Sequence, residues 1–279
     1  AEVNEDLSWS ELSSKKLKCN VSNYGSGGYG LYQSYLKYKI NSKFDNSEII
    51  VLNHTTENIA RIRNQYRELI YQNQKKGFKP TAYLDENGNL IHVPIVSFKN
   101  YQDYKFNVEN IKKNKFKYEY YLPEYNFSNF NFNYSYIYNF VYALFKHHRI
   151  KKFINKEPWF SHHYLNNDDI NLTYKIIDEF INLAKFNQKV PVITIIPTCK
   201  DLKYFKSKGK FVYQPLVNLL KSNQVFFIDF GAKLSQRNDF NDYKNWFKNC
   251  SGHPNVLGYK LISDIFVKEI SENIKFNTN

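Results

Sequence analysis

The sequence predicts an α/β protein, a doubly wound domain built on a parallel sheet, and three observations lead to this prediction. Apolar runs of strand length occur at residues 48–52, 190–196 and 225–228. Most are followed by a polar loop and then by apolar residues at helical spacing, which is typical of parallel strands joined by helices. A chain of 279 residues can bury one full core. We therefore expect a single domain over residues 1–279 with an insertion at residues 70–157.

Helical and extended patterns alternate in the first third of the chain. A polar loop follows the second expected strand, and Thr55 or Thr56 there is placed to cap the next helix. The expected order is a helix within residues 1–18, a strand at 19–23, a glycine-rich turn at 25–30, a helix from Leu31, a strand at 48–52 and a helix from Ile59.

The middle of the chain has a different character. Residues 78–95 are expected to form a hairpin whose turn is the run Asp-Glu-Asn-Gly-Asn at 85–89. Residues 101–133 are dense in Asn, Lys, Tyr and Phe without clean periodicity. The regular alternation then returns. We expect a helix capped by Asp168 or Asp169 and reaching Ala184, a strand at 190–196, a helix around 216–220, a strand at 225–228 and a last helix after Pro254.

Composition limits the classes of function. The net charge of +13 and the basic clusters at residues 112–117 and 146–152, with interleaved aromatics, suit single-stranded nucleic acid. The whole chain is, however, rich in residues of A/T-rich codons, and no recognition motif accompanies the charge, so nucleic acid is not the favoured partner. No apolar run approaches the ~20 residues that span a bilayer. The three cysteines are widely spaced and do not indicate a disulfide framework or a metal site.

Three loops at the expected carboxyl ends of strands carry the residues suited to chemistry, because active sites of open parallel sheets form there. The turn around Gly28 can aim backbone N–H groups at a developing oxyanion. Asn58, or Asn53 as the alternative, can donate a second hydrogen bond. His253 lies on a loop just before the last helix, and imidazole suits a general base. The other histidines, including the adjacent pairs, are expected to have no catalytic role and to bind no metal.

Together these loops resemble the SGNH (GDSL-type) hydrolases, a superfamily of esterases, lipases and carbohydrate O-acyltransferases or deacetylases. Asn23-Tyr24-Gly25-Ser26-Gly27-Gly28 resembles the family's second block, and Ser251-Gly252-His253-Pro254-Asn255-Val256-Leu257-Gly258-Tyr259 its fifth. The resemblance covers residues 5–67 and 160–272. It implies a flavodoxin-like α/β/α sandwich with strand order 2-1-3-4-5. It also implies that His253 is the catalytic histidine and that Gly28 and Asn58 form the oxyanion hole.

The chain departs from the family pattern in three ways. The third block lacks its usual Gly-x-Asn-Asp. The catalytic acid is expected three residues before His253, where Cys250 stands, so Asp229 or Asp242 is the alternative, or a backbone carbonyl orients His253 in a dyad. The Gly-Asp-Ser block with the nucleophile is absent. Since the chain also has no Met, we expect a first strand to be missing from this sequence, between the strands at 19–23 and 48–52.

The sequence thus predicts an ester hydrolase or O-acyltransferase that acts on an acylated carbohydrate by a Ser-His mechanism without a cofactor. The nucleophile lies outside this chain, which is expected to be inactive by itself, and Ser26 is a poorly placed substitute. Two alternatives remain: a non-catalytic carbohydrate-binding relative, and a basic nucleic-acid-binding protein.

Overall fold

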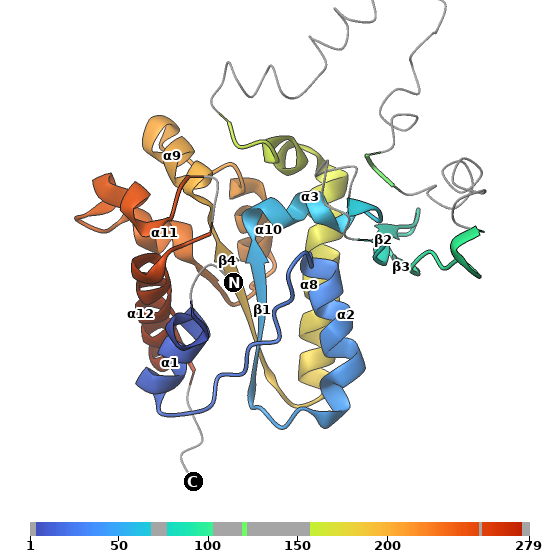
Figure 1. Ribbon diagram of the computed structural model, residues 1–279, viewed down its shortest axis with the longest axis horizontal. Coiled ribbons are helices and arrows are strands. Elements are labelled where there is room, and N and C mark those ends of the chain that lie inside the picture. Colours follow the sequence, from blue (N-terminus) through green and yellow to red (C-terminus); the bar gives the residue numbers. More distant parts are fainter. Residues whose placement is uncertain (1–3, 68–76, 103–118, 122–156, 251–252, 275–279) are drawn as a thin grey trace, which may run out of the picture.

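The computed structural model describes residues 4–67, 77–102, 119–121, 157–250 and 253–274, and it has a mixed α/β architecture (Figure 1). Its main sheet is parallel and has the strand order β1-β4-β5. A separate antiparallel hairpin is formed by β2 and β3. The strands are β1 (Ile49–Thr55), β2 (Thr81–Leu84), β3 (Leu90–Val93), β4 (Val190–Ile196) and β5 (Phe227–Asp229).

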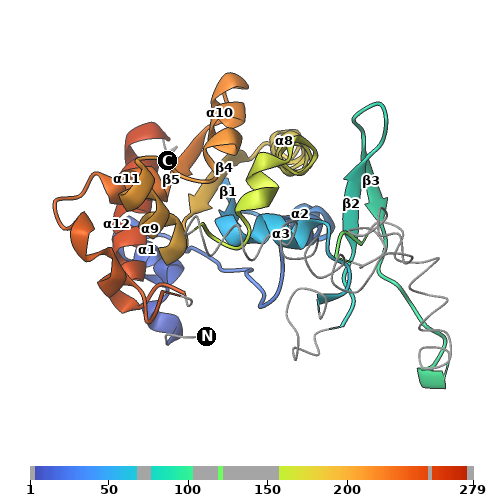
Figure 2. The ribbon, with the colours of Figure 1, turned by 90° about the horizontal axis from the view of Figure 1, so that it is seen from above.

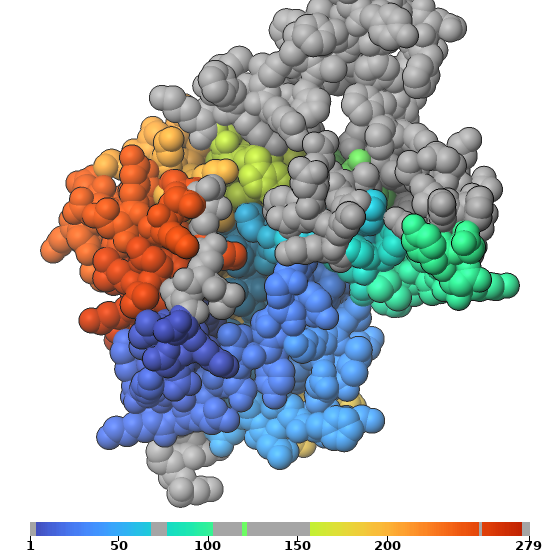
Figure 3. Space-filling view, viewed as in Figure 1, coloured from blue at the N-terminus to red at the C-terminus, as the bar shows by residue number. Residues whose placement is uncertain are grey.

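Two groups of helices accompany the sheet. The long helix α8 packs against β4 and α2, and α1 packs along α12, so the two ends of the chain meet. Figure 2 shows the strands between the pair α8 and α10 and the pair α1 and α12. In Figure 3 the first and last thirds of the chain share one face. The helices are α1 (Trp9–Leu17), α2 (Leu31–Asn41), α3 (Ile59–Ile62), α8 (Asn167–Phe186), α9 (Cys199–Lys208), α10 (Gln214–Ser222), α11 (Phe230–Ser235) and α12 (Val256–Asn273).

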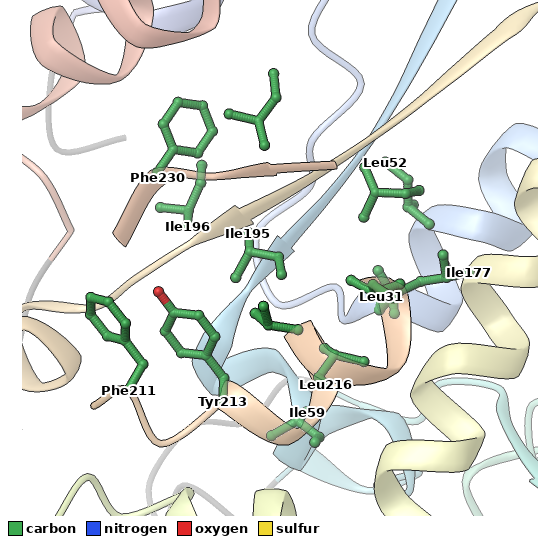
Figure 4. Close-up of a cluster of buried hydrophobic side chains, with 14 of the residues drawn as sticks. Leu31, Leu52, Ile59, Ile177, Ile195, Ile196, Phe211, Tyr213, Leu216 and Phe230 are labelled. Atoms are coloured by element: carbon green, nitrogen blue, oxygen red, sulfur yellow. The ribbon is translucent and has the colours of Figure 1, made fainter. Parts of the chain in front are cut away.

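Strand β4 is the centre of the core. Its residues from Val192 to Ile196 are buried without alternation, as expected for a strand covered on both faces. Successive side chains nevertheless point to opposite sides. Ile196 lies with Phe230 on one side, and Ile195 faces Tyr213 on the other (Figure 4). Burial of both faces of β4 therefore explains the apolar run that predicted this strand.

Strand β1 is a half-buried edge strand. Ile50, Leu52 and His54 are buried and alternate with half-buried residues. Within the described residues β1 pairs only with β4, from Ile49 opposite Val190 to Thr55 opposite Ile196. One edge of β1 thus carries no ladder partner in the described part of the chain.

The prediction of a strand at residues 19–23 is wrong. These residues form no ladder, and all but Val21 are exposed. Water can satisfy the backbone groups of this exposed segment, and a ladder forms only where a neighbouring strand lies alongside. In the described residues, therefore, only the strand at 48–52 of the two expected neighbours of a missing strand belongs to the sheet, as β1.

Several other expectations can be compared with the structure. The hairpin is confirmed, with its turn at Asp85–Asn89, but most of the insertion at 70–157 and both basic clusters lie outside the described residues. Neither Thr55 nor Thr56 caps a helix through its side chain. Helix α8 is capped by Asn166 instead of Asp168 or Asp169. Helices α9 and α11 were not predicted.

Candidate functional site

The turn that carries Gly28 lies at the N-terminus of α2. Gly28 has φ +89°, a conformation that favours glycine, and Tyr29 N–H closes the turn on the Ser26 carbonyl at 3.2 Å. Gly30 caps α2, and its N–H donates to Gln33 Oε1 at 2.7 Å. Within the described residues the Gly28 N–H donates to no group. The turn thus offers a backbone donor of the kind that an oxyanion requires.

A basic group borders this turn. A Cβ on Gly28 would lie 2.7 Å from Arg67 Nη1, and a Cβ on Gly30 would lie 3.0 Å from Arg61 Cβ. Lys79 Nζ donates to the Arg61 carbonyl at 3.2 Å. Burial lowers the pKa of Lys79 to about 7, helped by the positive charges of Arg61 and Arg67 and opposed by Glu119. The surroundings of Gly28 therefore favour negative charge, and sequence reasoning missed them because nothing in the spacing links residues 28, 67 and 79.

Asn58 stands directly before α3, three residues after β1 ends. Its side chain is half-buried, and its Oδ1 is buried without a hydrogen-bond partner in the described residues. The alternative, Asn53, lies within β1, where its Oδ1 accepts from Thr194 Oγ1 at 3.0 Å. The loop expected from residue 53 thus begins only after Thr55. Asn58 is therefore better placed than Asn53 to donate at the strand ends.

His253 is exposed on the loop between the 3-10 helix Phe240–Trp246 and α12. The base of this loop is closed by a bridge between Phe247 and Pro254 and by Asn255 N–H donating to the Trp246 carbonyl at 3.0 Å. A Cβ on Gly258 would lie 2.2 Å from that carbonyl, so only glycine fits there. Below the loop is a small apolar pocket lined by Ile196, Pro197, Leu234, Trp246, Phe247, Pro254, Gly258, Leu261 and Ile262. His253 thus lies near the end of β4.

The cysteine prediction is wrong, because Cys199 and Cys250 form a disulfide with Cα atoms 5.0 Å apart. Cys199 is the first residue of α9, just after β4, so the bond ties the His253 loop to the carboxyl end of that strand. Fifty-one positions separate the two cysteines. Only the fold brings them together, and Cys19 remains free.

The alternative acids do not pair with His253. Asp229 caps α11 by accepting from Ala232 N–H at 3.0 Å, and it also accepts from Tyr213 Oη at 2.9 Å. Asp242 is exposed in the preceding 3-10 helix, and no hydrogen bond joins it to His253. Ser26 Oγ accepts from Lys37 Nζ at 3.2 Å, and no histidine of the described chain is bonded to it.

The structure links Gly28 and Asn58 only through the chain segment between Asn58 and Arg67. The Gly28 turn packs on the segment 61–67, which continues from Asn58 through α3. His253 lies near the end of the neighbouring strand, and in the described residues no hydrogen bond joins it to Gly28 or Asn58. No helix in the described residues is long and apolar enough to cross a bilayer. Across the same residues there is no cluster of three His, Cys, Asp or Glu side chains suited to a metal ion.

A buried polar network lies beneath these strand ends. Asp201 Oδ2 accepts from Thr56 Oγ1 at 2.6 Å and from Thr198 N–H and Oγ1, each at 2.7 Å. Tyr164 Oη donates to the Thr56 carbonyl and lies 2.8 Å from His54 Nε2. Burial lowers the pKa of His54 to about 4, so this imidazole is neutral. The network joins the ends of β1 and β4, and it supports the loops above it.

Asp201→Asn should stabilise the protein at neutral pH but not at acidic pH. Burial raises the pKa of Asp201 from 3.8 to about 6, although the hydrogen bonds from Thr56 and Thr198 oppose the shift. The neutral acid is therefore favoured on folding, and the stability it confers is complete below pH ~4 and lost as pH rises through about 6. That loss amounts to about 3 kcal/mol. Urea unfolding of both proteins at pH 4 and pH 8 measures it, and an equal difference at the two pH values contradicts the assignment.

Comparisons with family models, with curated proteins and with solved structures gave no match for this chain.

Proposed function

We propose that this chain is the larger part of an SGNH-type serine esterase or O-acyltransferase with a doubly wound α/β/α fold. The observation that carries the proposal is the Gly28 turn, whose positive-φ glycine lies against Arg67 and beside the segment that begins at Asn58. A backbone donor, an amide and a positive charge gathered at strand ends suit the tetrahedral oxyanion of acyl transfer. The acylated carbohydrate substrate follows from the resemblance of the two sequence blocks alone.

In the proposed reaction a serine hydroxyl attacks the ester carbonyl, and His253 takes its proton and returns it to the leaving oxygen. Gly28 N–H and the Asn58 amide stabilise the oxyanion. No Gly-Asp-Ser sequence occurs among the 279 residues, so we place the serine on a segment outside them. One edge of β1 has no ladder partner among the described residues, and this supports the placement, because a parallel strand beside it would end next to the Gly28 turn.

The test compares the 279-residue chain with a form extended by the residues encoded directly upstream. We expect sustained turnover of p-nitrophenyl acetate and of an O-acetylated glycan by the extended form only, and its loss when the upstream serine is changed to alanine. Ser26→Ala is the matched control and should leave turnover unchanged. Sustained turnover by the 279-residue chain that depends on Ser26 would overturn the proposal, as would glycan binding without turnover by the extended form.

A further inference from the structure

A hydrogen-bonded chain of hydroxyl, imidazole and carboxylate includes none of the residues Gly28, Asn58 and His253. Tyr121 Oη is 2.7 Å from His163 Nε2, and His163 Nδ1 is 2.7 Å from Asp169 Oδ2. Asp169 belongs to the first turn of α8, and His163 to the 3-10 helix Ser161–Leu165 before it. We propose that these residues form a relay in which His163 activates the Tyr121 phenol as a nucleophile toward an activated acyl group.

The partners of His163 fix its tautomer. An ionised carboxylate only accepts hydrogen bonds, so the Nδ1 of a neutral His163 carries the proton and donates it to Asp169. Nε2 is then left with a lone pair, and Tyr121 Oη donates to it. This is the arrangement in which an imidazole removes a proton from a hydroxyl group.

Asp169 is held in its ionised form. Its other oxygen, Oδ1, accepts from Arg63 Nη1 at 3.0 Å. Burial acts to raise the pKa of Asp169, but the hydrogen bond from His163 together with the charge and hydrogen bond of Arg63 outweighs burial and lowers the pKa. A fixed negative charge behind His163 stabilises the imidazolium that forms when the Tyr121 proton is taken up.

The surrounding contacts hold the relay in place. Tyr121 N–H donates to Glu119 Oε1 at 3.1 Å, and Tyr120 N–H donates to the Arg63 carbonyl at 3.2 Å. The Tyr120 ring lies over the Arg63 guanidinium at 5.4 Å and beside the His163 ring at 5.2 Å. Tyr121 is therefore positioned by its backbone, and His163 by a ring contact, as well as by the relay itself.

The nucleophile Tyr121 is more exposed than its base His163, as expected of a group that must reach its substrate. His163 and Asp169 are 1% and 3% exposed, whereas Tyr121 is partly exposed. In the proposed step the phenolic oxygen forms a bond to the acyl carbon while the bond from that carbon to the leaving group breaks. The phenolic proton passes to His163 Nε2 and then to the leaving group. The step needs no oxidant or reductant and does not depend on the function proposed for His253.

The test uses the 279-residue chain and an arylsulfonyl fluoride, whose sulfur replaces the acyl carbon and whose fluoride is the leaving group. Modification rates at individual tyrosines are followed by digestion and mass spectrometry. General-base assistance is worth about 100-fold, so Tyr121 should react faster than Tyr24, which is 63% exposed and outside any relay. A residue that merely anchors its segment would react more slowly than Tyr24, because it is less accessible. A Tyr121 rate equal to or below that of Tyr24 overturns the proposal.

Variants locate the source of the activation. His163→Gln and Asp169→Asn should each reduce the Tyr121 rate toward that of Tyr24, whose own rate stays unchanged and reports an intact fold. Asp168→Asn is the matched control, since this neighbouring carboxylate is exposed and should not affect the rate. Unchanged labelling of Tyr121 in a folded His163→Gln protein contradicts the relay. If both relay variants unfold, the comparison of Tyr121 with Tyr24 in the unaltered chain decides alone.

Discussion

Loss of the Cys199–Cys250 disulfide is expected to lower the free energy of unfolding by about 4 kcal/mol. The bond closes a loop with a sequence separation of 51 residues, and loop-closure entropy of that length gives this magnitude. The loop includes β5 and helices α9 to α11. In the unfolded chain, one covalent bond therefore restricts the conformations of this whole loop.

Urea unfolding with and without a reducing agent measures the effect. Cys250→Ser should unfold at the same urea concentration in both conditions, and it should match the reduced unaltered chain. Cys19→Ser is the matched control, because Cys19 is exposed and free, and it should keep the full sensitivity to reductant. Thiol titration of the denatured, unreduced chain should find one free thiol, and three would show that the bond does not form.

The same bond has a consequence for His253. Cys250 stands three residues before His253, at the position where the family resemblance places the orienting acid. Neither Asp229 nor Asp242 is hydrogen-bonded to His253, and the disulfide ties the His253 loop to the start of α9. Reduction should therefore increase hydrogen exchange in residues 247–255. Disulfides persist mainly in oxidising compartments, where the Cys199–Cys250 bond would remain intact.

The sequence predicted the parts of the fold that depend on local pattern. The strand at residues 190–196 was found because burial on both faces demands an unbroken apolar run, and that run is visible without a structure. The hairpin was found because Asp-Glu-Asn-Gly-Asn is a turn sequence. Helix α9 was missed because its residues are mostly polar, although Thr198 and Asp201 form a capping box that marks its start.

Features that depend on distant residues could not be predicted. The strand expected at 19–23 has the right composition, yet a strand also needs a paired neighbour, and pattern does not supply one. Cys199 and Cys250 are brought together by β4 and the loop before α12. For the candidate site, local sequence identified Gly28, Asn58 and His253 as candidates, but the positive charges around Gly28 come from other elements.

His253→Ala, in the form extended to include the upstream serine, is expected to reduce kcat for ester turnover on the order of 10³-fold. The imidazole contributes only when the serine proton is transferred, so KM should change little. Val256→Ala is the matched control, because this residue is also exposed, begins α12 and offers no titratable group. It should leave kcat within a factor of about two, since surface substitutions have small effects.

Chemical rescue separates a catalytic role of His253 from a structural one. In His253→Gly the removed side chain leaves space on an exposed loop, so added imidazole can reach the serine and should restore part of kcat in proportion to its concentration. A loop that had merely collapsed would not respond to imidazole. Full activity of His253→Ala would exclude the proposed mechanism, because no other histidine of the described chain lies on a loop tied by the disulfide to the end of β4.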